Sequence, residues 1–183
     1  MVKLGASWGA TPAERAASFP CDGLCDGADA VYYRAVTVRT DAKSLFRWLC
    51  QLRVAPYSYD WIDNGGRRSP QILTPGVENL ALGQAVMKIF ELRAFEAGRS
   101  LTVVNKAHRG ARSVFGEVWV SYVIRPVSEG VMRLVAKVLV RYPRGLLGWV
   151  MRVVLPGGDL VMIRRQLLNL KRLAEREETG VSA

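Results

Sequence analysis

Histidine and cysteine are scarce in this sequence of 183 residues. The histidine is His108, and the three cysteines are Cys21, Cys25 and Cys50. An odd number of cysteines without regularly spaced pairs argues against a disulfide framework. A single histidine, outside any tight cluster of Cys and His, argues against a zinc site. We therefore expect free thiols in a reducing compartment, and neither a metal ion nor another cofactor.

Long apolar runs are also missing. The sequence contains no 18 consecutive apolar residues, so no membrane-spanning helix is expected. Residues 1–19 lack the continuous apolar stretch of a secretory signal. These two features predict a cytoplasmic protein. The length fits one domain, and 50% hydrophobic residues are enough for a core, or for a core with an apolar cavity.

Acidic residues are clearly fewer than basic residues. Lys and Arg number 26 against 16 Asp and Glu, which gives a net charge of +10. This excess favours anionic partners, such as nucleic acid, an anionic membrane surface or an acidic small molecule. The basic residues are scattered and form no recognisable nucleic-acid-binding signature, so we expect no nucleic-acid partner.

The first half of the chain combines a lead-in, a strand and two helices. Residues 1–30 show no periodicity and are predicted to be irregular. Val31–Arg39 alternates as a strand does, and apolar residues then recur at helical spacing over 41–52. Pro56 suits the first turn of a second, short helix over Pro56–Asp63.

The second half is predicted to be a run of strands that ends in a helix. The expected strands are Gln84–Phe95, Arg99–Lys106, Ser113–Pro126 and Gly130–Tyr142. Short turns between them imply antiparallel hairpins, and the alternation predicts one covered face and one wet face.

The closing helix is expected to begin after a break at Pro156-Gly157-Gly158, with Asp159 as its cap, and to run to about residue 178. Its apolar stripe should pack on the covered face of the sheet. That stripe consists of Leu160, Ile163, Leu167, Leu170 and Ala174. The preceding segment, Gly145–Leu155, is apolar on nearly all sides, and residues 179–183 are expected to be a disordered tail.

This order of elements is that of the helix-grip fold, and the chain resembles the START-like superfamily. That superfamily, also called SRPBCC, includes polyketide cyclases, lipid-transfer domains and plant allergens of the birch-pollen type. The chain is most similar to small bacterial members, over about residues 31–176. The matching segments are Ala55–Asn64, Gly66–Pro70, Gly83-Gln84, Gly158–Met162 and Arg165–Lys171. The resemblance implies an α+β domain over 31–178, in which a curved antiparallel sheet wraps around a long C-terminal helix and leaves an internal hydrophobic cavity.

Aromatic and charged residues concentrate in the stretch Pro56–Pro70. Tyr57, Asp60 and Trp61 have the spacing i, i+3, i+4, so they share one face if the short helix forms. Arg68 follows within reach of the same loop. We predict that this cluster lines or gates the cavity, with Asp60 held by an arginine.

A structural alternative for this cluster stays open. Asp60 or Asp63 could pair with Arg67 or Arg68 and only close the loop, because charged residues are rarely buried unless they are paired.

Three further residues are candidates for ligand contact. Tyr122 shares the apolar face of its predicted strand, and Met162 and Gln166 lie one turn apart on the closing helix. For Met162 the alternative is plain core packing.

Three functions fit these features. The first is binding of a hydrophobic small molecule, lipid-like or polyketide-like, through Tyr57, Asp60, Trp61, Arg68, Tyr122, Met162 and Gln166. The second is a cyclase, dehydratase or hydrolase that acts on a natural-product intermediate in the same cavity, with Asp60, Tyr57 and Arg68 as catalytic residues. The third is an anionic-membrane-surface protein in which Leu146–Leu155 inserts while Arg144, Arg152 and Arg164 meet the headgroups.

Overall fold

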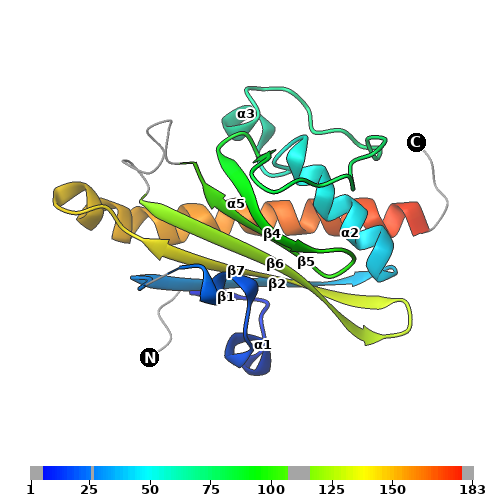
Figure 1. Cartoon of the computed structure of the whole chain (residues 1–183), viewed down its shortest axis with the longest axis horizontal. Helices are drawn as coiled ribbons and strands as arrows, with labels where there is room; N and C mark the ends of the chain where they lie inside the picture. The colour runs from blue at the N-terminus through cyan, green and yellow to red at the C-terminus, as the bar shows by residue number, and fades with distance from the viewer. Residues whose placement is uncertain (1–5, 26, 107–115, 179–183) are drawn as a thin grey trace.

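A seven-stranded sheet and one long helix make up most of the protein (Figure 1). The computed structural model describes residues 6–25, 27–106 and 116–178. The strand order is β1-β2-β7-β6-β5-β4-β3, and all neighbours are antiparallel except the pair β1 and β2. The strands are β1 Ser7–Trp8, β2 Ala30–Arg39, β3 Ala85–Val86, β4 Phe90–Glu96, β5 Ser100–Asn105, β6 Glu117–Ser128 and β7 Val131–Arg141. His108, the start of the predicted strand Ser113–Pro126 and the predicted tail 179–183 lie outside the described residues.

The long helix α5, Leu146–Glu178, crosses one face of the sheet, and the predicted α+β helix-grip arrangement is confirmed (Figure 1). Its C-terminal half buries Leu167, Leu170, Leu173 and Ala174 almost completely. These side chains pack with the alternate residues of β6 and β7 that the sequence assigns to the covered face. The helix also packs on α2, Ala42–Cys50, where the indole nitrogen of Trp48 donates to Glu177 at 2.7 Å.

The predicted break before Asp159 is wrong, because α5 continues through Pro156 without interruption. A proline inside a helix removes one hydrogen bond and costs about 3 kcal/mol. Leu155 and Ile163 pack against the core on either side of Pro156, and Asp159 forms an ion pair with the sheet. These tertiary contacts outweigh the local preference to end the helix.

The prediction of an irregular N-terminal segment is also wrong for the described residues. They form β1, the helix α1 Pro12–Ala16 and a 3-10 turn over Pro20–Gly23. Thr11 caps α1 in a capping box: its hydroxyl accepts from Glu14 N at 3.2 Å, and the Glu14 carboxylate accepts from Thr11 N at 2.7 Å. Thr11-x-x-Glu14 is a sequence signature of a helix start that the search for periodicity misses.

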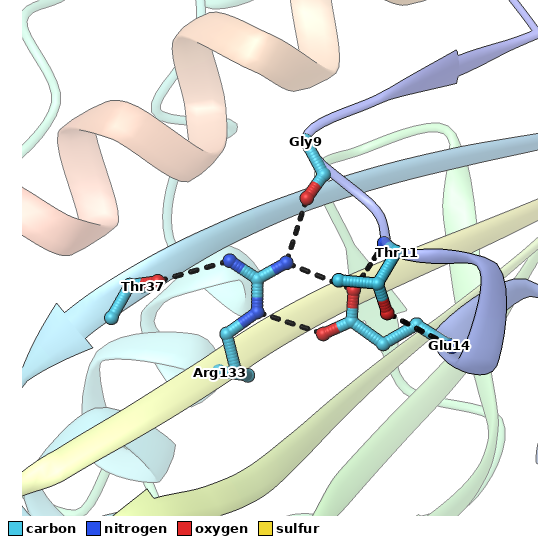
Figure 2. Close-up of polar contacts among 5 residues, drawn as sticks. All are labelled: Gly9, Thr11, Glu14, Thr37 and Arg133. Carbon is cyan, nitrogen blue, oxygen red and sulfur yellow. Dashed lines mark hydrogen bonds and ion pairs between the residues drawn. The ribbon is translucent and has the colours of Figure 1, made fainter.

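Arg133 of β7 fastens this segment to the outer face of the sheet (Figure 2). Its guanidinium donates to both carboxylate oxygens of Glu14, at 2.7 and 2.9 Å, to Gly9 O at 2.7 Å and to the Thr37 hydroxyl at 3.0 Å. The face of the sheet away from α5, which the sequence predicts to be exposed to water, is partly covered by the N-terminal segment. A second apolar cluster covers it, with Phe19 and Cys21 packed against Trp119, Val123, Val135 and Leu139.

The burial of Leu167 generates a first prediction. Replacing Leu167 with Ala should lower the free energy of unfolding by about 2–5 kcal/mol, because the side chain is fully buried. Its exposed neighbour supplies the control: Leu168→Ala should change stability by no more than about 0.5 kcal/mol. Chemical denaturation measures both values, and an unchanged midpoint for Leu167→Ala would contradict the packing.

The contact in Figure 2 generates a second prediction. The hydrogen bond from Arg133 lowers the pKa of Glu14, against the opposing effect of burial. The resulting stabilisation is complete above the unfolded pKa of about 4.3 and is lost as pH falls through the lower folded pKa. Glu14→Gln should therefore destabilise the protein at neutral pH, and the difference from wild type should shrink below about pH 4. Urea titrations over this pH range measure the difference, and Glu129→Gln, which removes the same charge at an exposed position, is the control.

Candidate functional site

An apolar pocket lies between the N-terminal half of α5 and the sheet. Its volume is about 350 Å³. Its apolar walls come from the β3–β4 region, from β6 and from α5, namely Met87, Ile89, Phe90, Val118, Val120, Met151, Val154, Leu155, Met162 and Ile163. Val154 is exposed as well as lining the pocket, so the pocket reaches the surface beside this residue. The resemblance to the helix-grip fold implies an internal hydrophobic cavity between the sheet and this helix.

A buried pair of polar side chains sits in the wall of this pocket. Tyr122 of β6 donates its hydroxyl to Gln166 Oε1 at 2.6 Å, and Gln166 Nε2 donates to Pro56 O at 2.6 Å. Burial raises the pKa of Tyr122, so its hydroxyl stays neutral. Gln166 therefore connects α5, β6 and the loop before α3. Tyr122, Met162 and Gln166, all three predicted from the sequence, line this pocket.

One member of a buried ion pair lines the pocket. Arg34 of β2 is fully buried and donates from Nη2 to Asp159 Oδ2 at 2.8 Å and from Nη1 to Tyr33 O at 2.8 Å. Asp159 lines the pocket from α5. Burial raises the pKa of Asp159 to about 6, and the positive charge of Arg34 opposes that rise. Desolvation lowers the pKa of Arg34.

The local sequence pattern does not single out Arg34, and it predicts Asp159 as a helix cap. A signal was available, because Arg34 lies two residues from Tyr32 and from Val36 and so shares their face of the strand. Tyr32 and Val36 are core residues. An arginine on a core face needs a buried acid as its partner.

A second carboxylate, Asp63, also faces the pocket. It accepts a short hydrogen bond from the Ser58 hydroxyl through Oδ2. Its other oxygen, Oδ1, is buried and has no hydrogen-bond partner among the described residues. Burial raises the pKa of Asp63. The pocket thus offers two acids, Asp63 and Asp159, in largely apolar surroundings.

The predicted cluster Tyr57, Asp60, Trp61 and Arg68 lies elsewhere. These four residues line a second, more polar pocket of about 620 Å³, together with Arg165 and Arg172, and Ser58 lines both pockets. The prediction that Tyr57, Asp60 and Trp61 share a helical face is wrong, because α3 spans only Asp60–Asp63 and Tyr57 has a φ of +56°. Tyr57 points inward and packs edge-on against Trp48, whereas Trp61 is 75% exposed.

The predicted pairing of Asp60 with an arginine is replaced by hydrogen bonds within the loop. Asp60 accepts from the backbone N–H of Ser69 at 2.8 Å and from its hydroxyl at 2.5 Å. The Tyr57 hydroxyl accepts from Gln51 Nε2 at 3.0 Å and donates to Pro70 O at 2.8 Å. Asp60 therefore closes the loop, as the structural alternative predicts. Its partners are the neutral donors of Ser69, and not Arg67 or Arg68. Among the described residues, no group of three metal-ligating side chains is placed to hold an ion.

The ion pair generates a third prediction. Arg34→Met should lower the free energy of unfolding by about 3–5 kcal/mol, because it leaves Asp159 buried without its partner. Arg34→Met combined with Asp159→Leu should recover most of this loss, since no charge is then left unpaired. Urea denaturation of the single and double variants measures the coupling. Additive losses in the double variant would show that the two residues stabilise the fold independently.

The fold has relatives among solved structures, although no protein-family model and no curated protein sequence matches the chain. Protein MLL2253 from Mesorhizobium loti superposes with a TM-score of 0.52 at 15% identity, over 80% of this chain and 97% of that one. Protein CV1439 from Chromobacterium violaceum gives 0.50 at 11% identity, over 79% and 96%. The Zhui aromatase/cyclase from a Streptomyces species gives 0.48 at 13% identity, over 81% and 94%. At these identities the likeness shows the fold alone, and the chain has the helix-grip fold that the sequence predicts.

Proposed function

We propose that the protein binds a hydrophobic small molecule, lipid-like or polyketide-like, in the apolar pocket beneath α5. The main observation that supports this proposal is the apolar pocket itself, with the carboxylates of Asp63 and Asp159 in its wall. Its volume of about 350 Å³ falls in the range of small-molecule sites, which are mostly apolar with a few convergent polar groups. The START-like fold supports the same function only in general terms.

The polar groups favour a ligand that carries a hydrogen-bond donor. Asp63 Oδ1 is a buried acceptor without a partner among the described residues, and leaving such an atom unsatisfied costs free energy. A hydroxyl or phenol of the ligand would supply the missing bond. The body of the ligand would lie against Phe90, Val120 and Met162.

The second candidate function is catalysis on the same class of molecule by a cyclase, dehydratase or hydrolase. The observation that favours it is the raised pKa of two pocket carboxyls, Asp159 and Asp63, since acids with a pKa nearer to neutrality can transfer protons. Tyr57, Asp60 and Arg68, the catalytic candidates from the sequence, line the second, more polar pocket instead. The proton-transfer role in this proposal therefore moves to Asp159, with Asp63 as its partner.

The fourth prediction tests ligand binding with a neutral fluorescent probe, N-phenyl-1-naphthylamine. Met162→Trp should fill the pocket and lower probe affinity at least about tenfold, because the added side chain occupies the ligand's volume. Val161→Trp is the matched control, one position along the same helix but on its exposed side, and should bind as wild type does. Equal affinities for all three proteins would contradict the proposal.

Native mass spectrometry of the purified protein separates carriage from catalysis. A retained apolar molecule whose mass stays constant on incubation would favour a carrier. Loss or gain of one water, abolished by Asp159→Asn, would select the enzyme, provided that thermal melting shows the variant to be folded. In that case the pH profile of turnover should change near pH 6, where Asp159 titrates.

A further inference from the structure

The outer side of α5 presents an apolar face that nothing in the described chain covers. Leu146, Trp149, Val153, Val154 and Val161 are between 51% and 80% exposed. Leu146, Trp149 and Val153 follow one another at intervals of three and four residues, and Val154 and Val161 are seven apart, so all five lie toward one side of the helix. The opposite side faces the core and the apolar pocket, through residues such as Leu155 and Met162. We call these five exposed residues the outer face of α5.

An arginine-rich pocket lies at the N-terminal end of this face. Arg141, Arg144 and Arg152 line it together with Trp149 and one acid, Asp29, and its volume is about 490 Å³. Arg152 pairs with Asp29 at 3.0 Å, so the lining keeps an excess of two positive charges.

A similar pocket lies beyond the other end of the face. Its basic residues are Arg68, Arg165 and Arg172, its acid is Asp60, and its exposed aromatic residue is Trp61. Asp60 is held by Ser69, and Arg172 donates to Gln71 Oε1 at 3.0 Å. Three arginines and one acid again leave two positive charges in excess. Leu168, which lines this pocket, lies 22 positions after Leu146, or about 33 Å along the helix axis.

We propose that the outer face of α5 docks on an anionic lipid bilayer, with lipid phosphates in the two arginine-rich pockets. Apolar side chains between basic groups, with tryptophans at the edges, match the layered chemistry of a membrane interface. A second copy of this chain fits poorly, because pairing two such faces would bring like charges together.

The helix lies in the plane of the bilayer and does not cross it. By length and composition alone α5 could span a membrane, since its most apolar window has a mean hydropathy of 1.6. Its inner side, however, carries Asp159 in an ion pair with Arg34, and its C-terminal half belongs to the core. Val154 lies both on the outer face and at the rim of the apolar pocket. If the pocket binds a ligand as proposed above, docking would bring its opening to the acyl chains.

Sedimentation of the full chain with vesicles provides the fifth prediction. The protein should bind vesicles of phosphatidylcholine mixed with phosphatidylglycerol, and bind pure phosphatidylcholine more weakly. Raising salt from 0.1 to 1 M shortens the screening length from about 10 to about 3 Å and should weaken binding to the anionic vesicles. Removal of each pocket arginine, in Arg144→Gln and Arg165→Gln, should weaken binding about fivefold, and their combination about 25-fold.

Two controls separate this surface from the general basic charge. Val153→Glu should abolish most of the binding, whereas Val127→Glu, an equally drastic change at an exposed valine of β6, should not. Lys43→Gln removes one exposed charge from α2 and should weaken binding less than Arg144→Gln does. A blue shift of tryptophan fluorescence on binding should be reduced in Trp149→Phe.

Three results would overturn the proposal. One is no sedimentation with either vesicle at either salt concentration. Another is binding that Val153→Glu and Val127→Glu weaken equally. The third is a dimer in solution that Val153→Glu dissociates, without vesicle binding, which would assign the face to a second copy of the chain. None of these results bears on probe binding in the apolar pocket, so the ligand proposal is tested separately.

Discussion

The ion pair between Arg34 and Asp159 ties the middle of the long helix to the sheet. It joins residues 125 positions apart, on β2 and α5, and both side chains are almost entirely shielded from water. Removing either partner would leave a buried charge without a counter-ion. The pair therefore favours one position of α5 on the sheet. It lies one turn beyond Pro156, where the helix is weakest. The continuity of α5 and the position of Asp159 in the wall of the apolar pocket both depend on this contact.

One helix therefore serves several purposes along its length. Its C-terminal half completes the core through Leu167, Leu170 and Leu173. Its N-terminal half forms one wall of the apolar pocket on the inner side and exposes Leu146, Trp149 and Val153 on the other. The sequence of Gly145–Leu155 is apolar on nearly all sides because this segment has two apolar surfaces. One lines the apolar pocket and the other is exposed.

The sequence predicts several residues of the pocket wall, but it does not predict the acids Asp63 and Asp159 that face the pocket. Strand and helix periodicity predicts Tyr122, Met162 and Gln166, which line the pocket, because a local pattern shows which side of an element faces inward. The predicted helical face of Tyr57, Asp60 and Trp61 does not form, because one expected helical turn is absent and Tyr57 adopts a positive φ instead. The sequence suggests for Asp63 only a role in closing the loop, although its carboxylate faces the pocket.

Local patterns in the sequence predict the order of elements, the inward-facing positions of β6 and β7 and the apolar stripe of α5, because each depends on neighbours a few residues away. Three other features depend on long-range contacts. These are the passage of the helix through Pro156, the pairing of Arg34 with Asp159 and the covering of the outer sheet face by Phe19 and Cys21. In each case a distant contact outweighs a local preference. Such contacts depend on which residues the fold brings together, and no local pattern records that.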